Sequence, residues 1–146
     1  MISKYKKIVI KIGSSSIVNE KTKKFKTAWL QSICKDIQLI HKNKKIVIVC
    51  SGAIALGSKL INKKNISRLE DKQAAAAIGQ IKLSKFWEQE LNKNKINSAQ
   101  ILLTLDDSEI RRRYLNIRKT INALHKKNII PIINENDTVA TEEIRF

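Results

Sequence analysis

The side chains that could do chemistry fall in polar stretches that directly follow apolar runs, at residues 11–16, 51–53, 104–107 and 134–137. In the first stretch, Gly13 lets the backbone approach a phosphate with no side chain in the way. The amides and hydroxyls that follow, beginning with Ser14, can donate hydrogen bonds to the phosphate oxygens. Lys11 supplies positive charge where negative charge develops. The pattern predicts phosphoryl transfer or the binding of a small charged metabolite.

The same residues have plainer structural explanations, which the sequence leaves open. A glycine such as Gly13 after a strand commonly marks only a turn, and Lys11 can extend its ammonium group past the apolar run to water or to an anion. Ser51, placed at the opening of a predicted helix, can act as an N-cap. Asp137, in the segment Asn134-Glu135-Asn136-Asp137, can cap a turn.

Other catalytic patterns are missing from the sequence. There is no GxxxxGK[ST] loop and no GxGxxG fingerprint, so neither a Walker-type nor a dinucleotide site is predicted. No Cys/His spacing typical of a metal site occurs, and no metal ligand is assigned. His41 and His125 each precede lysines near a predicted helix end, which suits a helix terminus. Neither lies near a candidate nucleophile, so a hydrolase triad is not indicated.

The polar stretches are positioned by alternating strands and helices. Apolar runs predict strands within residues 7–16 and at 46–49, 99–103 and 129–133. Helical spacing of apolar residues predicts helices over 30–40, 53–61, 67–91 and 110–124, the third opening on a capping-box sequence at Ser67. Continuous apolar strands separated by helices indicate an α/β, three-layer αβα sandwich with a mostly parallel sheet. Ligands bind beyond the carboxyl ends of such strands, where all the polar stretches lie.

Two finer expectations concern packing. Pro131 lies inside the fourth apolar run and predicts an edge strand or a bulge, because proline has no N–H to donate to a neighbouring strand. In the long helix, helical spacing predicts a buried face made of Ala74, Ala77, Ile81, Trp87 and Leu91.

The composition is typical of one cytoplasmic domain. With 42% hydrophobic residues the chain can build a single core, and no apolar run approaches the roughly 20 residues that cross a bilayer. The first residues lack the small-residue cleavage site of a secretory signal, so we expect a soluble protein with no membrane partner. Cys34 and Cys50 fall at apolar positions of predicted elements, where reduced core thiols are common.

The charge is strongly positive, with 29 Lys and Arg against 13 Asp and Glu and a net charge of +16. Such a charge attracts polyanions and anionic substrates. The lysines are spread along the whole chain, and the aromatic residues, 5% of the total, do not alternate with them. No base-stacking surface is therefore predicted, and a nucleic-acid partner is not expected. The three arginines at 111–113 are expected to form a solvated helix face.

Five segments together make the sequence recognisable. They are IVIKIGSSS, VIVCSGAIALG, KQAAAAIGQ (residues 72–80), LLT (102–104) and INENDTVAT (133–141). In this order, and across essentially the whole chain, they resemble the glutamate 5-kinase family of the amino-acid kinase superfamily. INENDTVAT together with SGAIALG favours this family over relatives that act on acetylglutamate, aspartate or UMP.

The resemblance implies ATP-dependent phosphorylation of the γ-carboxylate of L-glutamate to L-glutamyl 5-phosphate, the first step of proline biosynthesis, with ATP and Mg²⁺ as cofactors. It implies that Lys11 is catalytic and contacts the transferred phosphate, with Gly13 and Ser14 at the ATP phosphates. The residues implied at the glutamate are Ser51, Gly52, Asn134 and Asp137. A glutamate carboxylate with a pKa of about 4.3 is ionised at neutral pH and needs no general base, in agreement with the missing catalytic histidine.

The resemblance also implies what the sequence lacks. The GDND motif, which adds substrate contacts in the family, does not follow residue 141. The second half of the kinase domain, which holds most of the ATP site, does not follow it either. The C-terminal RNA-binding-like domain of many members is missing as well. We therefore expect residues 1–146 to be the N-terminal, glutamate-binding part of a truncated amino-acid kinase domain, with the full-length enzyme a homo-oligomer.

A second hypothesis belongs to another class of protein. A non-catalytic basic module that binds nucleic acid would also carry this charge. Salt-dependent binding to random-sequence RNA, with no effect of glutamate, would favour that module.

Overall fold

Strands and helices alternate along the chain, as the sequence predicts. The computed structural model describes residues 4–19, 21–61 and 68–140. The elements in order are β1 (Lys7–Ile12), α1 (Ser14–Ile17), α2 (Thr27–Ile40), β2 (Lys45–Cys50), α3 (Ala53–Gly57), α4 (Leu69–Lys93), β3 (Ser98–Leu103), α5 (Leu105–Glu109), α6 (Arg111–Lys126) and β4 (Ile130–Glu135).

The four strands form one parallel sheet in the order β1-β2-β4-β3. The register pairs Lys11 of β1 with Val49 of β2, and Val49 with Ile133 of β4. On the other side of β4, Glu135 pairs with Leu103 of β3. Because all four strands run in the same direction, the polar stretches that follow them emerge at one edge of the sheet. The predicted parallel sheet is confirmed.

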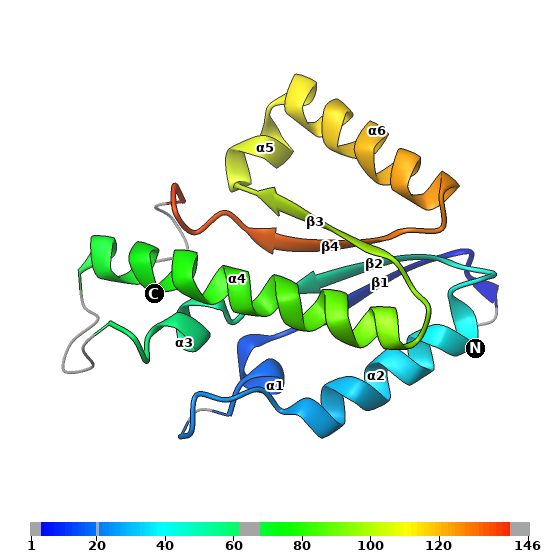
Figure 1. Cartoon of the computed structure of the whole chain (residues 1–146). Helices are drawn as coiled ribbons and strands as arrows, with labels where there is room; N and C mark the ends of the chain where they lie inside the picture. Colours follow the sequence, from blue (N-terminus) through cyan, green and yellow to red (C-terminus); the bar gives the residue numbers. More distant parts are fainter. Residues whose placement is uncertain (1–3, 20, 62–67, 141–146) are drawn as a thin grey trace.

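Helices cover both faces of the sheet, which makes the three-layer arrangement visible in Figure 1. Helices α5 and α6 lie on one side, and α1 to α4 lie on the other. Successive side chains of a strand point to opposite faces, so alternate residues of each strand meet different helices. On β2, Ile46 and Ile48 are buried and point toward the α4 side, while Val47 and Val49 on the other face remain half-exposed.

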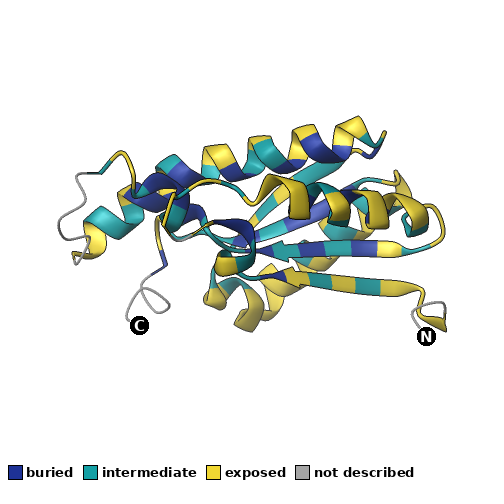
Figure 2. Ribbon diagram, turned by 90° about the horizontal axis from the view of Figure 1, so that it is seen from below, coloured by how far each residue is buried: buried dark blue, intermediate teal, exposed yellow. Residues whose placement is uncertain are grey.

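The core lies between the sheet and helices α2, α3 and α4 (Figure 2). Three large side chains at its centre are almost fully buried, namely Trp87 and Leu83 of α4 and Leu30 of α2. They pack in one cluster with Ile46 and Ile48. In contrast, α6 has no buried residue.

Two glycines allow α3 and α4 to cross in direct backbone contact. A Cβ at Gly79 would lie 1.7 Å from the carbonyl oxygen of Ala53, and a Cβ at Gly57 would lie 1.8 Å from that of Ala75. Real Cβ contacts are never this short, so only glycine fits at either position. The crossing fixes how α4 is rotated about its own axis.

The prediction of the buried face of α4 was wrong for three of its five residues. Trp87 and Leu91 are buried, but Ala74 and Ala77 are exposed and Ile81 is 73% exposed. The buried stripe in the first half of the helix instead runs through Ala75, Ala76 and Gly79. Apolar spacing missed it because the tight contact with α3 selects the smallest residues rather than the most hydrophobic ones.

The expectation that Pro131 marks an edge strand or bulge was also wrong. Strand β4 lies inside the sheet, between β2 and β3, and Pro131 is buried and paired in register with Ala99. The pairing of β4 with β2 begins only at Ile132, one residue after the proline. Proline is tolerated near the first residue of a strand, where the ladder on one side has not yet started.

Helix boundaries differ modestly from the predicted ones. Helix α3 ends at Gly57 rather than at residue 61. The predicted capping box at Ser67 lies outside the described residues, and α4 begins at Leu69. Across residues 4–19, 21–61 and 68–140, no helix is long and apolar enough to span a membrane.

Candidate functional site

The turns after β1 and β2 lie against each other at the carboxyl edge of the sheet. The backbone N–H of Ser51 donates to the carbonyl oxygen of Ile12 at 3.2 Å. Gly52 adopts a φ of 110°, a left-handed conformation that favours glycine, and a Cβ there would lie 3.5 Å from Ser14 Oγ. The structure therefore brings Ser51 and Gly52 together with the residues that follow Lys11.

Gly13 faces open space. Its φ of −72° and ψ of 160° are accessible to any residue, and a Cβ at this position would meet no atom of the described chain within 4 Å. Neither backbone conformation nor crowding by the described residues requires glycine here. The open space in front of Gly13 is what close approach of a ligand needs.

Lys11 and Asn134 lie on opposite faces of the sheet. Lys11 is exposed and shares its face with Val49 and Ile133, its partners across the register. Asn134 follows Ile133 and so points to the α4 side, where it is 4% exposed. Its Nδ2 donates to Oε1 of Gln80 at 2.6 Å. The side chains of Lys11 and Asn134 are therefore not brought together, although their strand ends share one edge.

Asp137 lies in a turn that is fastened to the end of the sheet. The N–H of Asn136 donates to the carbonyl oxygen of Leu103 at 2.7 Å, which ties the turn to β3. The carbonyl oxygen of Asn136 accepts from the N–H groups of Val139 and Ala140 at 3.1 and 3.0 Å. Asp137, half-buried, is thus carried on a short loop with a defined backbone.

A polar hollow lies at the same edge, between the ends of β3 and β4, where the predicted polar stretches 104–107 and 134–137 meet. Its volume is about 490 Å³, and its polar lining comes from Thr104, Asp106, Asp107, Arg113, Glu135 and Asn136. The three arginines at 111–113 are exposed, as predicted, and Arg113 also donates to Asp107 at 3.1 Å. The T-x-x-D spacing of Thr104 and Asp107 was the signal that could have indicated an ordered helix start here.

Thr104 and Asp107 form a capping box at the start of α5. The backbone N–H of Thr104 donates to Asp107 Oδ2 at 2.8 Å, and the Thr104 hydroxyl donates to the same oxygen at 2.9 Å. These hydrogen bonds, with a smaller contribution from Arg113, lower the pKa of Asp107. The Asp107 carboxylate therefore stays ionised at neutral pH, where it accepts hydrogen bonds from Thr104 and Arg113.

Both cysteines are buried free thiols, as predicted. Burial raises the pKa of Cys50 to about 12 and that of Cys34 to about 11. The indole N–H of Trp87 lowers the pKa of Cys50 by less than burial raises it, and Nε1 makes no hydrogen bond with the described residues. Thiols with such pKa values remain protonated and are not nucleophiles at neutral pH.

Residues 4–19, 21–61 and 68–140 contain no cluster of three or more His, Cys, Asp or Glu side chains that could hold a metal ion. The oxygen donors at the edge are carboxylates on different elements, such as Asp106 on α5 and Asp137 in the turn after β4. Mg²⁺ in phosphoryl-transfer sites is held largely by substrate phosphates and water, with one or two carboxylates. This donor set suits such an ion and does not suit a structural metal.

A parallel sheet covered by helices on both faces, with Gly/Ser turns and a lysine at its carboxyl edge, defines a three-layer α/β domain with a candidate phosphate site. The sequence matches the amino acid kinase family over residues 6–146, and the chain belongs to that family. In solved structures, the fold is similar to UMP kinase from Bacillus anthracis, with a TM-score of 0.59 at 18% identity over 88% of this chain and 52% of that one. The fold is also similar to that of UMP kinase from Ureaplasma parvum, with a TM-score of 0.57 at 19% identity, over 90% of this chain and 55% of that one.

Within the family, the chain is most informatively compared with proteins named glutamate 5-kinase. It is 51% identical to that of Sinorhizobium fredii over 99% of this chain, a match that spans 37% of the relative. The protein from Rhizobium rhizogenes is also 51% identical over 99% of this chain and 38% of its own length. The chain therefore spans a little over a third of the length of these relatives.

Proposed function

We propose that this chain forms the glutamate-binding part of an enzyme that transfers the γ-phosphoryl group of ATP to the γ-carboxylate of L-glutamate. The products are L-glutamyl 5-phosphate and ADP. The 51% identity to proteins named glutamate 5-kinase supports this substrate. The structural observation that carries the proposal is the shared edge, where the turns after Lys11, Cys50 and Asn134 emerge side by side from parallel strands.

The chemistry needs alignment and charge neutralisation rather than a base. Both reactants are anions at neutral pH, and the carboxylate of glutamate is already a nucleophile. Lys11 would neutralise charge on the transferred phosphoryl group, and the backbone at Gly13 with the hydroxyl of Ser14 would donate to phosphate oxygens. Mg²⁺, when bound with ATP, neutralises further charge on the phosphates.

The glutamate would be held from the two other turns. Ser51 and Gly52 stand beside the phosphate turn and would contact the reacting end of the substrate. Asp137 would accept hydrogen bonds from its α-ammonium group. Asn134 already donates its amide to Gln80, so we assign it the task of shaping the turn that carries Asp137.

Binding of the whole ATP molecule would need more residues than these. Adenine and ribose would be bound by the region of the relatives that this chain does not match, since the chain spans 37% of the Sinorhizobium fredii protein. Residues 1–146 would then be one functional part of a longer kinase domain.

The test uses a chimera in which this chain replaces the matching region of the Sinorhizobium fredii glutamate 5-kinase. Asp137→Asn should raise the KM for glutamate about ten- to a hundredfold, because a charge-assisted hydrogen bond is lost. The KM for ATP should stay within a few-fold. The measurement is glutamate-dependent release of ADP at varied concentrations of each substrate.

Glu109→Gln is the matched control, since Glu109 is an exposed carboxylate at the end of α5 and does not line the polar hollow. It should leave both KM values unchanged. If Asp137→Asn weakened ATP and not glutamate, Asp137 would belong to the nucleotide or metal site. If it changed neither, its role would be that of a turn cap.

A further inference from the structure

Helix α4 contacts both turns of the candidate glutamate site through two consecutive residues. At Gly79 the helix backbone meets the carbonyl oxygen of Ala53, the residue that follows Ser51 and Gly52. At Gln80 the side chain accepts the hydrogen bond from Asn134, near the end of β4, which leads into the turn that carries Asp137. The two turns come from strands that are adjacent in the sheet, and α4 bridges their ends from one side.

The contact at Gly79 is rigid. A Cβ at this position would lie 1.7 Å from Ala53 O and 2.8 Å from the backbone nitrogen of Gly57, so α4 rests directly on the backbone of α3. Backbone against backbone leaves no side chain that could adjust its rotamer. The height of α4 above the turn at Ser51 is therefore fixed.

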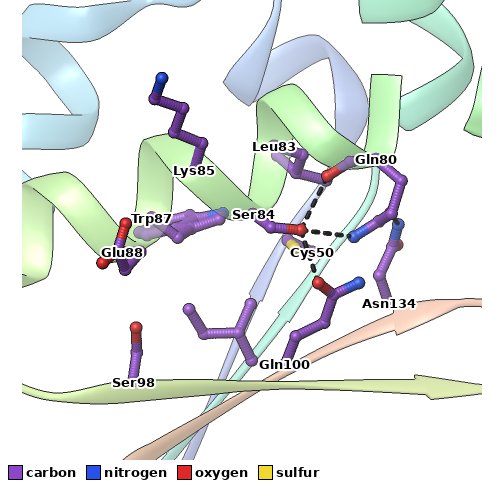
Figure 3. A pocket seen from close by; sticks show the side chains of 11 residues that line it. Cys50, Gln80, Leu83, Ser84, Lys85, Trp87, Glu88, Ser98, Gln100 and Asn134 are labelled. Atoms are coloured by element: carbon purple, nitrogen blue, oxygen red, sulfur yellow. Dashed lines mark hydrogen bonds between the residues drawn. The ribbon is translucent and has the colours of Figure 1, made fainter. Parts of the chain in front are cut away.

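The contact at Gln80 is short, partly buried, and lies at the wall of the pocket in Figure 3. Asn134 is 4% exposed, and its Nδ2 lies 2.6 Å from Gln80 Oε1. A buried amide that loses its partner carries the full cost of desolvation, so this hydrogen bond strongly favours one arrangement of β4 against α4.

A second hydrogen bond orients the Gln80 side chain, as Figure 3 shows. Its Nε2 donates to Ser84 Oγ at 3.3 Å, and that hydroxyl lies 2.6 Å from Oε1 of Gln100 on β3. Gln80 therefore connects α4 to β4 directly and to β3 through Ser84. Of these two links, only the one to Asn134 reaches the turn with Asp137.

We infer that Gly79 and Gln80 are positioning residues that set the separation between the Ser51 turn and the Asp137 turn, and so the length of amino acid that fits between them. The inference rests on the proposed function for its substrate. Neither residue needs to touch glutamate. Each acts through a contact with the turn that does: Gly79 through Ala53, and Gln80 through Asn134.

The first test is kinetic and uses the chimera described above. Gln80→Leu keeps the size of the side chain but removes the acceptor for Asn134, and it should raise the KM for glutamate about tenfold with the KM for ATP within twofold. Gln80→Glu keeps an acceptor oxygen and should restore the KM for glutamate to within threefold of the original. Ser84→Ala removes the other partner of Gln80 and should leave both KM values within twofold.

A double-variant comparison separates positioning from general loosening of the fold. Asn134→Ala and Gln80→Leu remove the two ends of one hydrogen bond, so the double variant should be no worse than the more affected single variant. Additive effects, or an equal effect of Ser84→Ala, would overturn the inference. So would a Gln80→Leu enzyme with an unchanged KM for glutamate.

The second test does not depend on activity. Amide NMR spectra of this chain should show that Gln80→Leu shifts the resonances of residues 134–140, whereas Ser84→Ala leaves them in place. If the chimera with the unaltered sequence did not phosphorylate glutamate, the proposed function would fail, and the spectra would still decide whether Gln80 positions the turn that carries Asp137. Unshifted resonances of residues 134–140 in Gln80→Leu would overturn the inference by themselves.

Discussion

The two faces of the sheet are covered by helices that pack to different depths, α4 on one face and α6 on the other. Helix α6 has the stronger helical periodicity, with Ile117, Ile121 and Leu124 facing the sheet, yet none of its residues is buried. Helix α4 has a weaker periodicity and supplies the centre of the core through Leu83 and Trp87. Amphipathic spacing thus predicts which side of a helix faces inward, but close packing depends on small residues where backbones meet.

Because of this difference, the α4 side of the candidate site is tightly packed, and the α6 side is less constrained. The turn at Ser51 is fixed against α4 by backbone contact, and the end of β4 at Asn134 is fixed against it by a partly buried hydrogen bond. Lys11 lies on the other face, where side chains near β1 are exposed. Under the proposed function, glutamate would be held between the two fixed turns. The exposed ammonium group of Lys11 would then reach the transferred phosphoryl group from the other face, which would align the two anions.

The largest effect should come from breaking the contact between α3 and α4. Gly79→Ala places a methyl group on the Ala53 carbonyl, which cannot move without displacing the Ser51 turn, so the free energy of unfolding should fall by more than about 3 kcal/mol. The check is urea denaturation followed by circular dichroism. Gly13→Ala is the control, since a Cβ at Gly13 meets nothing within 4 Å, and it should change stability by less than about 1 kcal/mol. Equal losses for the two variants would contradict the tight crossing.

The next effect compares one leucine from each helix layer. Leu83→Ala removes a side chain that is 1% exposed in the core and should cost about 3 kcal/mol of unfolding free energy. Leu124→Ala removes a half-buried leucine from α6 and should cost about 1 kcal/mol, because much of that side chain is already in contact with water. Both values come from denaturant midpoints of the same chain. Equal costs would show that α6 is packed as tightly as α4.

The smallest effect concerns how the stability contributed by the capping box at the start of α5 depends on pH. The lowered pKa of Asp107 means that the unfolded chain takes up a proton near the ordinary value of 3.8 while the folded carboxylate stays ionised. The unfolded state then binds more protons, so the stability from Asp107 is present above pH 3.8 and is lost as pH falls through the folded pKa. Asp107→Asn should be less stable than the original chain at pH 6, and the gap should close in that acidic window.

The matched control for this pH effect is Asp36→Asn, which removes an exposed carboxylate on α2. Thermal unfolding at a series of pH values measures both variants. A gap between Asp107→Asn and the original chain that stayed constant from pH 6 to pH 3 would show that the capping box does not lower this pKa.

The sequence by itself determined the local elements and the edge at which the polar stretches meet. Strand runs such as residues 46–49 are recognisable because a continuous apolar segment between polar turns depends only on near neighbours in the chain. The alternation of such runs with helices implies a parallel sheet, and a parallel sheet gathers Lys11, Ser51 and Asp137 at one edge. These parts of the candidate site therefore follow from the order of residues alone.

The tertiary structure decided everything that depends on contacts between distant segments. Strand β4 lies inside the sheet despite Pro131, because its pairing with β2 starts beyond the proline. The hydrogen bond between Gln80 and Asn134 joins residues 54 positions apart, and no local pattern encodes it. The buried face of α4 follows from where the backbone of Gly79 meets α3. Each outcome is set by complementary surfaces of separate elements, which exist only once the chain has folded.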